Sequence, residues 1–458
     1  MTGEYYLFET DGETFIFERN SSSIIVTSPE MSLAINKYLD LSCETFLDPF
    51  EQYLQMNLQN LLAQLCKGKI DTVGTTYEEP EYLEINLMVS NDCNLLCRYC
   101  FAKEIFMDQF SGKMSPDIAK RAIDVFISTG LLTSVIFMGG EPTLARELIK
   151  NTVEYVIERC SSLGFNIPKF PIVTNAISID KNFLDFISEH NMELIISYDG
   201  PPEVHDLHRV FRNGTGTHDI VWRNIQIVRE VGIPFLIEAT YTKQHQSMGL
   251  SVRNLFETLS QLGAESIYIM PVGHKDKSIG FSDEDSKVLF KLFKEAAMSS
   301  LVLRNTTQPQ YSYSRSVMSV FGERKLRLRM CDAGINSFTI MPDGSVFPCY
   351  FLSQDNMCFG RLDRNSFPTV SDLVERGKAL FNGNQKENYI NCRNCWAKNM
   401  CFGCYGPSIQ ELGLVSTPPK HFCSALRGLV LGTIIGLIKI RKNSNFNITF
   451  NQERKLGI

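Results

Sequence analysis

The alternation of strand-like and helix-like segments between residues 83 and 272 is the feature that most constrains how this chain can fold. Six short apolar runs are separated by longer segments with apolar residues at three- and four-residue spacing. We expect strands at 83–90, 135–138, 170–174, 194–197, 235–241 and 267–270, and helices at 116–128, 145–163, 181–190, 219–231 and 251–262. Such alternation is typical of parallel strands joined by right-handed crossover helices. Six repeats favour an α/β fold, a partial (β/α)6 barrel open on one side, with its chemistry at the carboxyl ends of the strands.

The segments on either side of this barrel have different patterns. Residues 1–80 contain three short apolar runs, at 5–8, 14–17 and 24–27, followed by helical periodicity at 29–39 and 46–65. We expect a small module of strands and helices there, ending in a polar linker at 72–80. The predicted domains are therefore 1–80, the barrel at 81–275, a helical bridge at 276–330 and a cysteine-rich region at 331–458.

Composition and charge limit the classes of function. With 458 residues the chain can form two or three domains. Its net charge of −6 argues against a broad nucleic-acid-binding surface. The first residues lack the basic segment and apolar run of a secretory signal, so we expect a cytoplasmic protein.

The longest apolar stretch lies near the C-terminus, at 428–440, and is shorter than the roughly 20 residues of a membrane-spanning helix. Gly428, Gly432 and Gly436 fall on one helical face, a spacing also found in membrane-helix dimers. We expect a buried terminal helix that packs closely on the protein body, and no membrane span.

Fourteen cysteines in a chain without a secretory signal indicate metal or cluster ligation, because the cytosol is reducing. Cys93, Cys97 and Cys100 directly follow the first predicted strand, and three thiolates on one loop can hold three irons of a 4Fe–4S cluster and leave the fourth open. Structural zinc is the alternative, but it needs a fourth ligand and none follows nearby. Cys43, Cys66 and Cys160 stand alone, as buried structural thiols do.

The motif CxxxCxxC directly after the first strand of a β/α repeat resembles the radical S-adenosylmethionine (SAM) enzymes. The resemblance implies that the open iron binds the amino and carboxylate groups of SAM, and that one electron releases a 5′-deoxyadenosyl radical that abstracts hydrogen. The segment Gly139-Gly140-Glu141-Pro142 resembles the family element that orients the methionine amino group, although alone it could be a plain turn. Glycines allow close backbone approach, and a carboxylate can accept hydrogen bonds from an ammonium.

Further polar residues stand at the predicted strand ends. Asn175 ends the third strand, and Ser197 and Asp199 end the fourth, where the family contacts the ribose of SAM. Arg209 resembles a family arginine that pairs with the SAM carboxylate, a task that suits the guanidinium fork. Met270, at the end of the sixth strand, could pack against adenine.

The cysteines after residue 330 resemble the SPASM extension of radical SAM enzymes, which carries two auxiliary Fe–S clusters. The resemblance implies an outer cluster on Cys392, Cys395, Cys401 and Cys423, and an inner cluster on Cys331, Cys349 and Cys404. Cys358 could complete the inner set, or an iron could stay open for a substrate thiolate. Two residues separate Cys401 from Cys404, where the family usually has three. A zinc ribbon is the alternative for this spacing. The implied cofactors are SAM and three 4Fe–4S clusters.

The stretch 197–217 resembles the peptide-maturase branch, the sactipeptide and ranthipeptide enzymes that form thioether crosslinks in ribosomally synthesised precursor peptides (RiPPs). Carbon–carbon crosslinking or epimerisation of a peptide is an alternative. A third is an anaerobic sulfatase-maturating enzyme, but Tyr350 stands where that branch places an aspartate base. A non-enzymatic electron-transfer or zinc-binding scaffold is the fourth.

The predicted partners follow from the same resemblance. The N-terminal module resembles the winged-helix element that binds the leader of a precursor peptide, by adding it as a strand to an exposed sheet edge. The expected partners are a precursor peptide with its leader and an electron donor such as ferredoxin or flavodoxin, with no nucleic acid.

Overall fold

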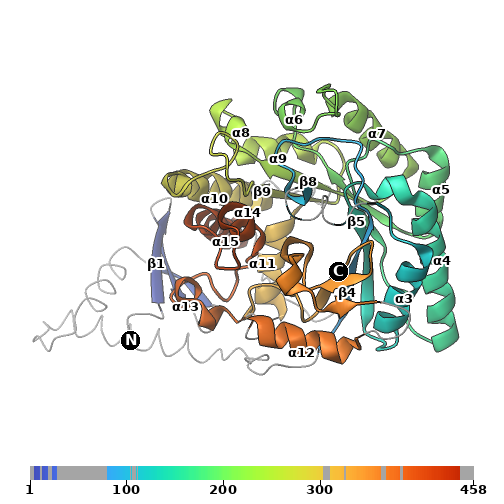
Figure 1. The fold of residues 1–458 in the computed structure, drawn as a ribbon. Helices are drawn as coiled ribbons and strands as arrows, with labels where there is room; N and C mark the ends of the chain where they lie inside the picture. Colours follow the sequence, from blue (N-terminus) through green and yellow to red (C-terminus); the bar gives the residue numbers. More distant parts are fainter. Residues whose placement is uncertain are drawn as a thin grey trace, which may run out of the picture. The chain divides into compact units, whose positions relative to one another are not determined.

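Figure 1 shows the fold in the computed structural model. The structure describes residues 5–10, 13–18, 23–27, 80–103, 105, 110, 112–302, 310–323, 326–362, 368–381 and 385–443. The chain forms two compact units, which are described separately below. The smaller unit comprises Met1–Thr76, Val317–Leu328 and Lys386–Cys401, and the larger unit comprises Tyr77–Ser316, Arg329–Gln385 and Phe402–Ile458.

Six parallel strands form the centre of the larger unit and confirm the predicted fold class. They are β4 (Leu83–Ser90), β5 (Leu132–Gly139), β6 (Pro171–Thr174), β7 (Glu193–Ser197), β8 (Phe235–Tyr241) and β9 (Ser266–Pro271). Neighbours in the chain are neighbours in the sheet, and every pair is parallel. The main crossover helices are α3 (Pro116–Ile127), α4 (Arg146–Leu163), α5 (Lys181–Glu189), α7 (His218–Val231) and α9 (Val252–Ser260). Helices α3, α4 and α5 lie along one side of the strands (Figure 1).

Local sequence signals explain where these helices begin and end. Ser115 caps α3 by accepting a hydrogen bond from the Ile118 N–H, and proline follows it at the first turn. Asp180 caps α5 in the same way. Gly164 ends α4 with φ of +70°, a conformation that favours glycine.

The cysteine-rich region extends the barrel sheet instead of forming a separate sheet. Strand β11 (Ser337–Ile340) pairs in parallel with β4, and β12 (Ser345–Phe347) and β13 (Gly360–Arg361) continue antiparallel. On the opposite edge, β10 (Gln310–Tyr311) pairs with β9. Strand β4 therefore has neighbours on both edges, and all of its residues except Glu84 are buried, as a central parallel strand requires.

The C-terminal helix α15 (Lys420–Asn443) packs closely on α10 (Ser286–Val302) through its glycines. A Cβ atom on Gly428 would lie 2.4 Å from the Phe290 carbonyl oxygen, and one on Gly432 would lie 2.2 Å from the Lys294 carbonyl oxygen. Helix α15 extends beyond both ends of the apolar stretch at 428–440. Residues Lys420–Ile440 are long and apolar enough to span a membrane, but 67% of their most apolar window is buried in the structure. The apolar face therefore serves helix packing.

The smaller unit contains an antiparallel sheet of β1 (Tyr5–Thr10), β2 (Glu13–Glu18) and β3 (Ser23–Thr27), in that order. These strands coincide with the three N-terminal apolar runs. Phe8 packs edge-on against Trp396, with ring centroids 4.7 Å apart, and Phe17 does the same at 6.1 Å. The predicted helices at 29–39 and 46–65, the linker, Cys43 and Cys66 lie outside the described residues.

Candidate active site

The three cysteines of the first motif lie on the loop that follows β4. The Cys100 N–H donates to the Cys97 carbonyl oxygen (3.2 Å), and the Leu95 N–H donates to Cys93 Sγ (3.4 Å). Burial raises the pKa of Cys93 to about 11 and that of Cys97 to about 12, and the charges of neighbouring cysteines on the loop add to both shifts. Iron that binds here must therefore displace protons from the thiols.

This donor set suits a cluster better than a single ion. In the described part of the chain, no three His, Cys, Asp or Glu side chains converge tightly enough to hold one metal ion. A cubane cluster takes each thiolate on a different iron, so its ligands are spaced apart. Three soft thiols on one loop fit iron in a 4Fe–4S cluster.

The segment after β5 packs directly against the cysteine loop. Gly139 has φ of +143°, and a Cβ atom there would lie 2.1 Å from the Ser90 carbonyl oxygen. A Cβ on Gly140 would lie 2.6 Å from the Asp92 carbonyl oxygen. The backbone N–H groups of Gly140 and Glu141 donate to these same two carbonyls, at 2.7 and 2.9 Å. Only glycines permit this approach, which fixes the loop that carries Cys93.

The Glu141 carboxylate is fully buried and joins the ends of β5 and β6. Oε1 accepts hydrogen bonds from the Thr143 N–H (3.0 Å), the Thr143 hydroxyl (2.6 Å) and the Thr174 hydroxyl (2.7 Å), and Oε2 accepts one from the Asn175 N–H (2.8 Å). Burial raises the pKa of Glu141, and these four donors oppose the shift. Pro142 then begins a 3-10 turn, η2 (Pro142–Ala145). The geometry therefore gives Glu141 a positioning role within the protein.

Asn175 connects the end of β6 to the cysteine loop. Its Nδ2 donates to Asn94 Oδ1 at 2.8 Å and lies 3.9 Å from Cys93 Sγ. Its Oδ1 accepts from the Ile177 N–H, and the intervening Ala176 has φ of +58°. The side chain of Asn175 is thus held against the loop by a local turn.

Asp199 and Arg209 form a buried ion pair beside the same loop. Arg209 Nε donates to Asp199 Oδ2 at 3.0 Å, the Tyr99 hydroxyl donates to the same oxygen, and the Thr240 N–H donates to Oδ1 at 2.9 Å. Burial opposes ionisation of Asp199, but Arg209, His205 and these donors outweigh it and lower its pKa to about 2. The guanidinium also lies over the Tyr99 ring, with Cζ 5.4 Å from the centroid. Because Tyr99 stands between Cys97 and Cys100, the pair anchors the loop.

Ser197, Glu238 and Tyr268 form one row across three neighbouring strands. Ser197 pairs in register with Glu238, and Glu238 pairs with Tyr268. On β8 the alternate residues are fully buried, and one of them, Tyr241, packs on Phe281 and Phe293. Glu238 therefore faces the opposite side of the sheet, and no hydrogen bond from the described residues reaches its carboxylate. Burial raises the pKa of Glu238, and Arg209 opposes the shift.

Sequence reasoning missed Tyr99 and Glu238. A signal was available for Glu238, because it is the one charged residue of an otherwise apolar strand (FLIEATY). Nothing local distinguishes Tyr99, whose role depends on Asp199, 100 positions away. Met270, at the end of β9, pairs in register with Thr240 and is half-buried.

Cys331, Cys349 and Cys404 lie together in the larger unit. Burial raises the pKa of Cys349, and the charges of Cys404 and Cys331 add to the shift. Burial, with the charge of Cys331, raises the pKa of Cys404 to about 12. Cys358 donates to the Gly360 carbonyl oxygen at 3.3 Å and packs on the apolar cluster that also contacts Cys100 and Tyr350. The structure thus groups three of the thiols predicted for the inner cluster.

Cys392, Cys395 and Cys401 lie together in the smaller unit. The Cys395 N–H donates to the Cys392 carbonyl oxygen at 2.9 Å, so these two share one tight turn. Burial raises the pKa of Cys392 to about 11, and the charges of Cys401 and Cys395 contribute in the same direction. Three of the four thiols predicted for the outer cluster therefore come together.

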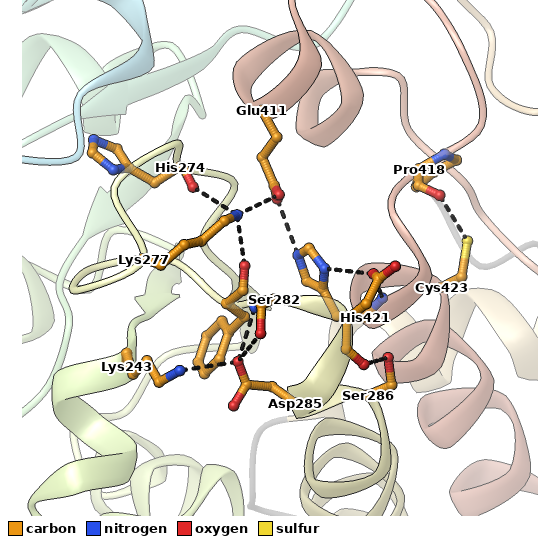
Figure 2. A network of polar contacts seen from close by, with 12 residues as sticks. Lys243, His274, Lys277, Ser282, Asp285, Ser286, Glu411, Pro418, His421 and Cys423 are labelled. Atoms are coloured by element: carbon orange, nitrogen blue, oxygen red, sulfur yellow. Dashed lines mark hydrogen bonds and ion pairs between the residues drawn. The ribbon is translucent and has the colours of Figure 1, made fainter.

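The fourth, Cys423, belongs to the larger unit and lies in the first turn of α15. Figure 2 shows the polar network beside it. The buried His421 contacts Glu411 Oε1 through Nε2 (3.0 Å) and Asp283 through Nδ1 (3.4 Å), and Lys277 Nζ donates to Glu411 Oε2 (2.8 Å). The network joins α14 (Gly406–Leu412) to the start of α15 and so positions Cys423, whose Sγ lies 3.4 Å from the Pro418 carbonyl oxygen.

Two protein-family models match this chain. The model of the Radical SAM superfamily matches residues 87–243, which include the second half of β4, the cysteine loop and strands β5 to β8. The model of the SPASM iron-sulfur cluster-binding domain matches residues 331–396.

Known proteins with different activities resemble the chain. The AdoMet-dependent heme synthase of Oleidesulfovibrio alaskensis is 26% identical over 335 residues, which cover 69% of this chain and 80% of that protein. The cysteine-type anaerobic sulfatase-maturating enzyme of Clostridium novyi is 25% identical over 336 residues, covering 69% and 85%. A solved structure of native anSMEcpe with bound AdoMet and Cp18Cys peptide has a TM-score of 0.64 at 20% identity, covering 79% of this chain and 99% of that one. Together with the strand order and the cysteine loop, the two family models show that the chain contains a Radical SAM domain at residues 87–243 and a SPASM domain at residues 331–396.

Proposed function

We propose that this protein uses SAM to modify a ribosomally synthesised precursor peptide by radical chemistry, with thioether formation from cysteine sulfur to carbon as the favoured product. The observation that carries the proposal is the single buried polar network at the strand ends. Glu141, Asn175, Asp199 and Arg209 are linked through hydrogen bonds to the loop that carries Cys93, Cys97 and Cys100. A structural metal site would not require such a network at the ends of β5, β6 and β7.

In this proposal Cys93, Cys97 and Cys100 hold a 4Fe–4S cluster, and SAM bound at its open iron supplies a 5′-deoxyadenosyl radical that removes hydrogen from the substrate. Gly139, Gly140, Glu141 and Pro142 shape the SAM pocket, with Glu141 acting through Asn175. Ser197 contacts the ribose. The Arg209 guanidinium has one hydrogen-bond partner among the described residues, at Nε, so its terminal nitrogens are available to the SAM carboxylate.

Two auxiliary 4Fe–4S clusters complete the proposal. Cys331, Cys349 and Cys404 would ligate the inner one, and Cys392, Cys395, Cys401 and Cys423 the outer one. Both thiol groups consist of soft donors that interact through their charges, as cluster ligands do. With the SAM-binding cluster this makes three.

Glu238 is the proposed proton acceptor for the substrate. It lies in register beside Ser197, on the side of the sheet opposite Tyr241, and its carboxylate accepts no hydrogen bond from the described residues. A partly buried carboxylate with a raised pKa is suited to general base catalysis near neutral pH. The alternative position, directly after Cys349, is occupied by Tyr350, and burial raises the pKa of that phenol further above its usual range. Tyr350 is therefore a poor base, which disfavours sulfatase maturation.

A peptide substrate is supported by the fold. The anSMEcpe structure holds a peptide together with AdoMet, so a fold of this kind can accommodate one. The sheet β1–β2–β3 has two outer strands, and we infer that a precursor leader adds to one of them, as in β-strand addition. The remaining partner is a ferredoxin or flavodoxin as electron donor, and the expected location is the cytoplasm.

The first experiment tests SAM cleavage. The protein is reconstituted with iron and sulfide without oxygen, reduced with dithionite and supplied with SAM, and 5′-deoxyadenosine is measured. Replacing Cys93, Cys97 and Cys100 with alanine should abolish 5′-deoxyadenosine formation. Cys160→Ala is the matched control, because Cys160 is buried in α4 and distant in sequence from the motif; it should retain cleavage. Persistent cleavage in the triple variant would refute the catalytic assignment.

The second experiment tests the peptide. The chain is co-expressed with short cysteine-containing peptides encoded beside its gene, and a thioether appears as loss of two hydrogens per crosslink by mass spectrometry. Glu238→Gln should cleave SAM yet release unmodified peptide. Deleting residues 1–75 should weaken leader binding while SAM cleavage persists. Wild-type protein that cleaves SAM but leaves every peptide unchanged would contradict the proposed function.

A further inference from the structure

Lys386 is a buried cation in the smaller unit, at the start of the 3-10 turn η7 (Lys386–Asn388). The residue is only 3% exposed. Its Nζ donates hydrogen bonds to three backbone carbonyl oxygens, those of Arg327 (2.6 Å), Lys398 (2.6 Å) and Cys401 (2.5 Å). Three acceptors require the three N–H groups of an ammonium, so the geometry itself specifies the charged form.

This ammonium has no carboxylate partner among the residues that the structure describes. Burying a charge is costly unless it is paired. The neighbouring Lys398 is different, because its Nζ contacts the Glu387 carboxylate. Neutral carbonyls satisfy the hydrogen bonds of Lys386 but supply no net negative charge. A compensating carboxylate is therefore missing from the residues that the structure describes.

Among the described residues of this unit, Cys392, Cys395 and Cys401 are the thiols that can supply negative charge. Burial lowers the pKa of Lys386 to about 8, and Cys401, Cys392 and Cys395 all act against that shift. The ammonium is thus held beside the trio by a hydrogen bond to the backbone of Cys401 itself.

We propose that Lys386 is a positioning residue whose fixed charge raises the reduction potential of an iron–sulfur cluster on Cys392, Cys395 and Cys401. The inference rests on the auxiliary cluster of the proposed function. A cluster held by thiolates is anionic and gains one further negative charge when it accepts an electron. A cation in a buried, low-dielectric position stabilises the reduced form more than the oxidised form.

A raised reduction potential would make this cluster an acceptor of electrons from the substrate. Thioether formation from a substrate radical and a thiol releases one electron and one proton, and a cluster of raised potential is the better acceptor for that electron. Lys386 therefore favours the outer cluster as an electron acceptor from the substrate side.

The test measures the midpoint potential of the cluster. Full-length protein with Cys93, Cys97 and Cys100 replaced by alanine is reconstituted, so that only auxiliary clusters remain, and is titrated under electron paramagnetic resonance detection. The signal that disappears in Cys392→Ala belongs to the outer cluster. Lys386→Met should move the potential of that signal to a more negative value, with iron content unchanged and the inner signal unmoved.

Arg393→Met is the matched control. Arg393 stands between Cys392 and Cys395 and also carries one positive charge, but it is exposed, so solvent screens it. It should shift the potential much less than Lys386→Met. Equal shifts in both variants would overturn the argument from burial.

An unchanged potential in an iron-loaded Lys386→Met protein would overturn the proposal directly. If that variant loses iron, Lys386→Gln keeps a hydrogen-bond donor without the charge, and its potential must still be more negative than that of wild type. Wild-type protein without an outer signal refutes both the cluster and the role of Lys386. If the potential shifts as expected in a protein that modifies no peptide, the role of Lys386 is supported and only the substrate assignment is refuted.

Discussion

Replacing Asp199 with asparagine tests whether the buried ion pair holds the candidate site together. The substitution keeps the shape of the side chain, and its carbonyl oxygen can still accept the Thr240 N–H bond at the Oδ1 position. It removes the negative charge that Arg209 and the Tyr99 hydroxyl both contact. Arg209 is then left as a buried cation, with its side chain only 11% exposed.

The size of the loss can be bounded in two ways. Asp199 has its pKa lowered from 3.8 to about 2, which corresponds to about 2 kcal/mol of stabilisation of the ionised form. Breaking a buried ion pair by removing one partner costs about 3–5 kcal/mol, because the other charge stays buried and unpaired. The first value compares only the two protonation states of Asp199. The second also includes the cost of leaving the Arg209 charge buried without a partner. We therefore expect Asp199→Asn to lower the free energy of unfolding by about 3 kcal/mol.

Glu257→Gln provides a matched control on the surface. Arg253 Nε donates to Glu257 at 2.8 Å, so the donor atom and bond length resemble those of the Arg209–Asp199 pair. The two side chains are 48% and 40% exposed. An exposed pair of this spacing contributes about 0.5 kcal/mol or less.

Both variants are unfolded with urea without oxygen and followed by far-ultraviolet circular dichroism. The free energies can be compared provided that the slopes with urea agree. If Asp199→Asn lies within about 1 kcal/mol of Glu257→Gln, burial does not strengthen the Asp199 pair and the reasoning fails.

Three further results are expected. Because the pKa of Asp199 is lowered on folding, its contribution to stability is present above pH 3.8 and is lost as pH falls toward 2. The unfolding free energies of the wild type and Asp199→Asn should therefore converge over that range. A constant difference between them would contradict this. Gly432→Ala gains about 1 kcal/mol in helix propensity, but its Cβ would lie 2.2 Å from the Lys294 carbonyl oxygen. Urea unfolding should therefore show a net loss of about 2 kcal/mol in the free energy of unfolding. Increased stability would show that α10 and α15 can separate freely. Glu141→Gln places an NH2 group against hydrogen-bond donors in either amide orientation. The substitution should therefore lower the free energy of unfolding by about 1–3 kcal/mol and slow SAM cleavage. A wild-type rate of 5′-deoxyadenosine formation would show that Glu141 is not part of the site.

Much of the barrel was predictable from local pattern. Strands β4 and β8 begin and end where the apolar runs do, and the other four differ by a few residues at most. Caps at Ser115 and Asp180 and a glycine at 164 set the helix ends through contacts within a few residues. The cysteine spacing likewise indicated a cluster loop, because spacing along one loop is itself local.

What the sequence left open depends on contacts between residues far apart in the chain. The glycines at 139 and 140 indicated a close approach, but only the folded chain shows that the partner is the cysteine loop. The pairing of β11 with β4 joins segments about 250 positions apart, and no local pattern specifies it.

The sequence by itself therefore indicated the class of chemistry, because the motif CxxxCxxC after a first parallel strand resembles the radical SAM enzymes and the Radical SAM family model matches residues 87–243. Tertiary structure decided how that chemistry is positioned. In the folded chain, Glu141 accepts hydrogen bonds from other residues of the protein, and Asp199 forms an ion pair with Arg209. Glu238 lies in register with Ser197, and Lys386 is buried and bonded to the backbone of Cys401. The physical reason is that periodicity and spacing report neighbours along the chain, whereas burial and charge pairing arise only when distant segments exclude water together.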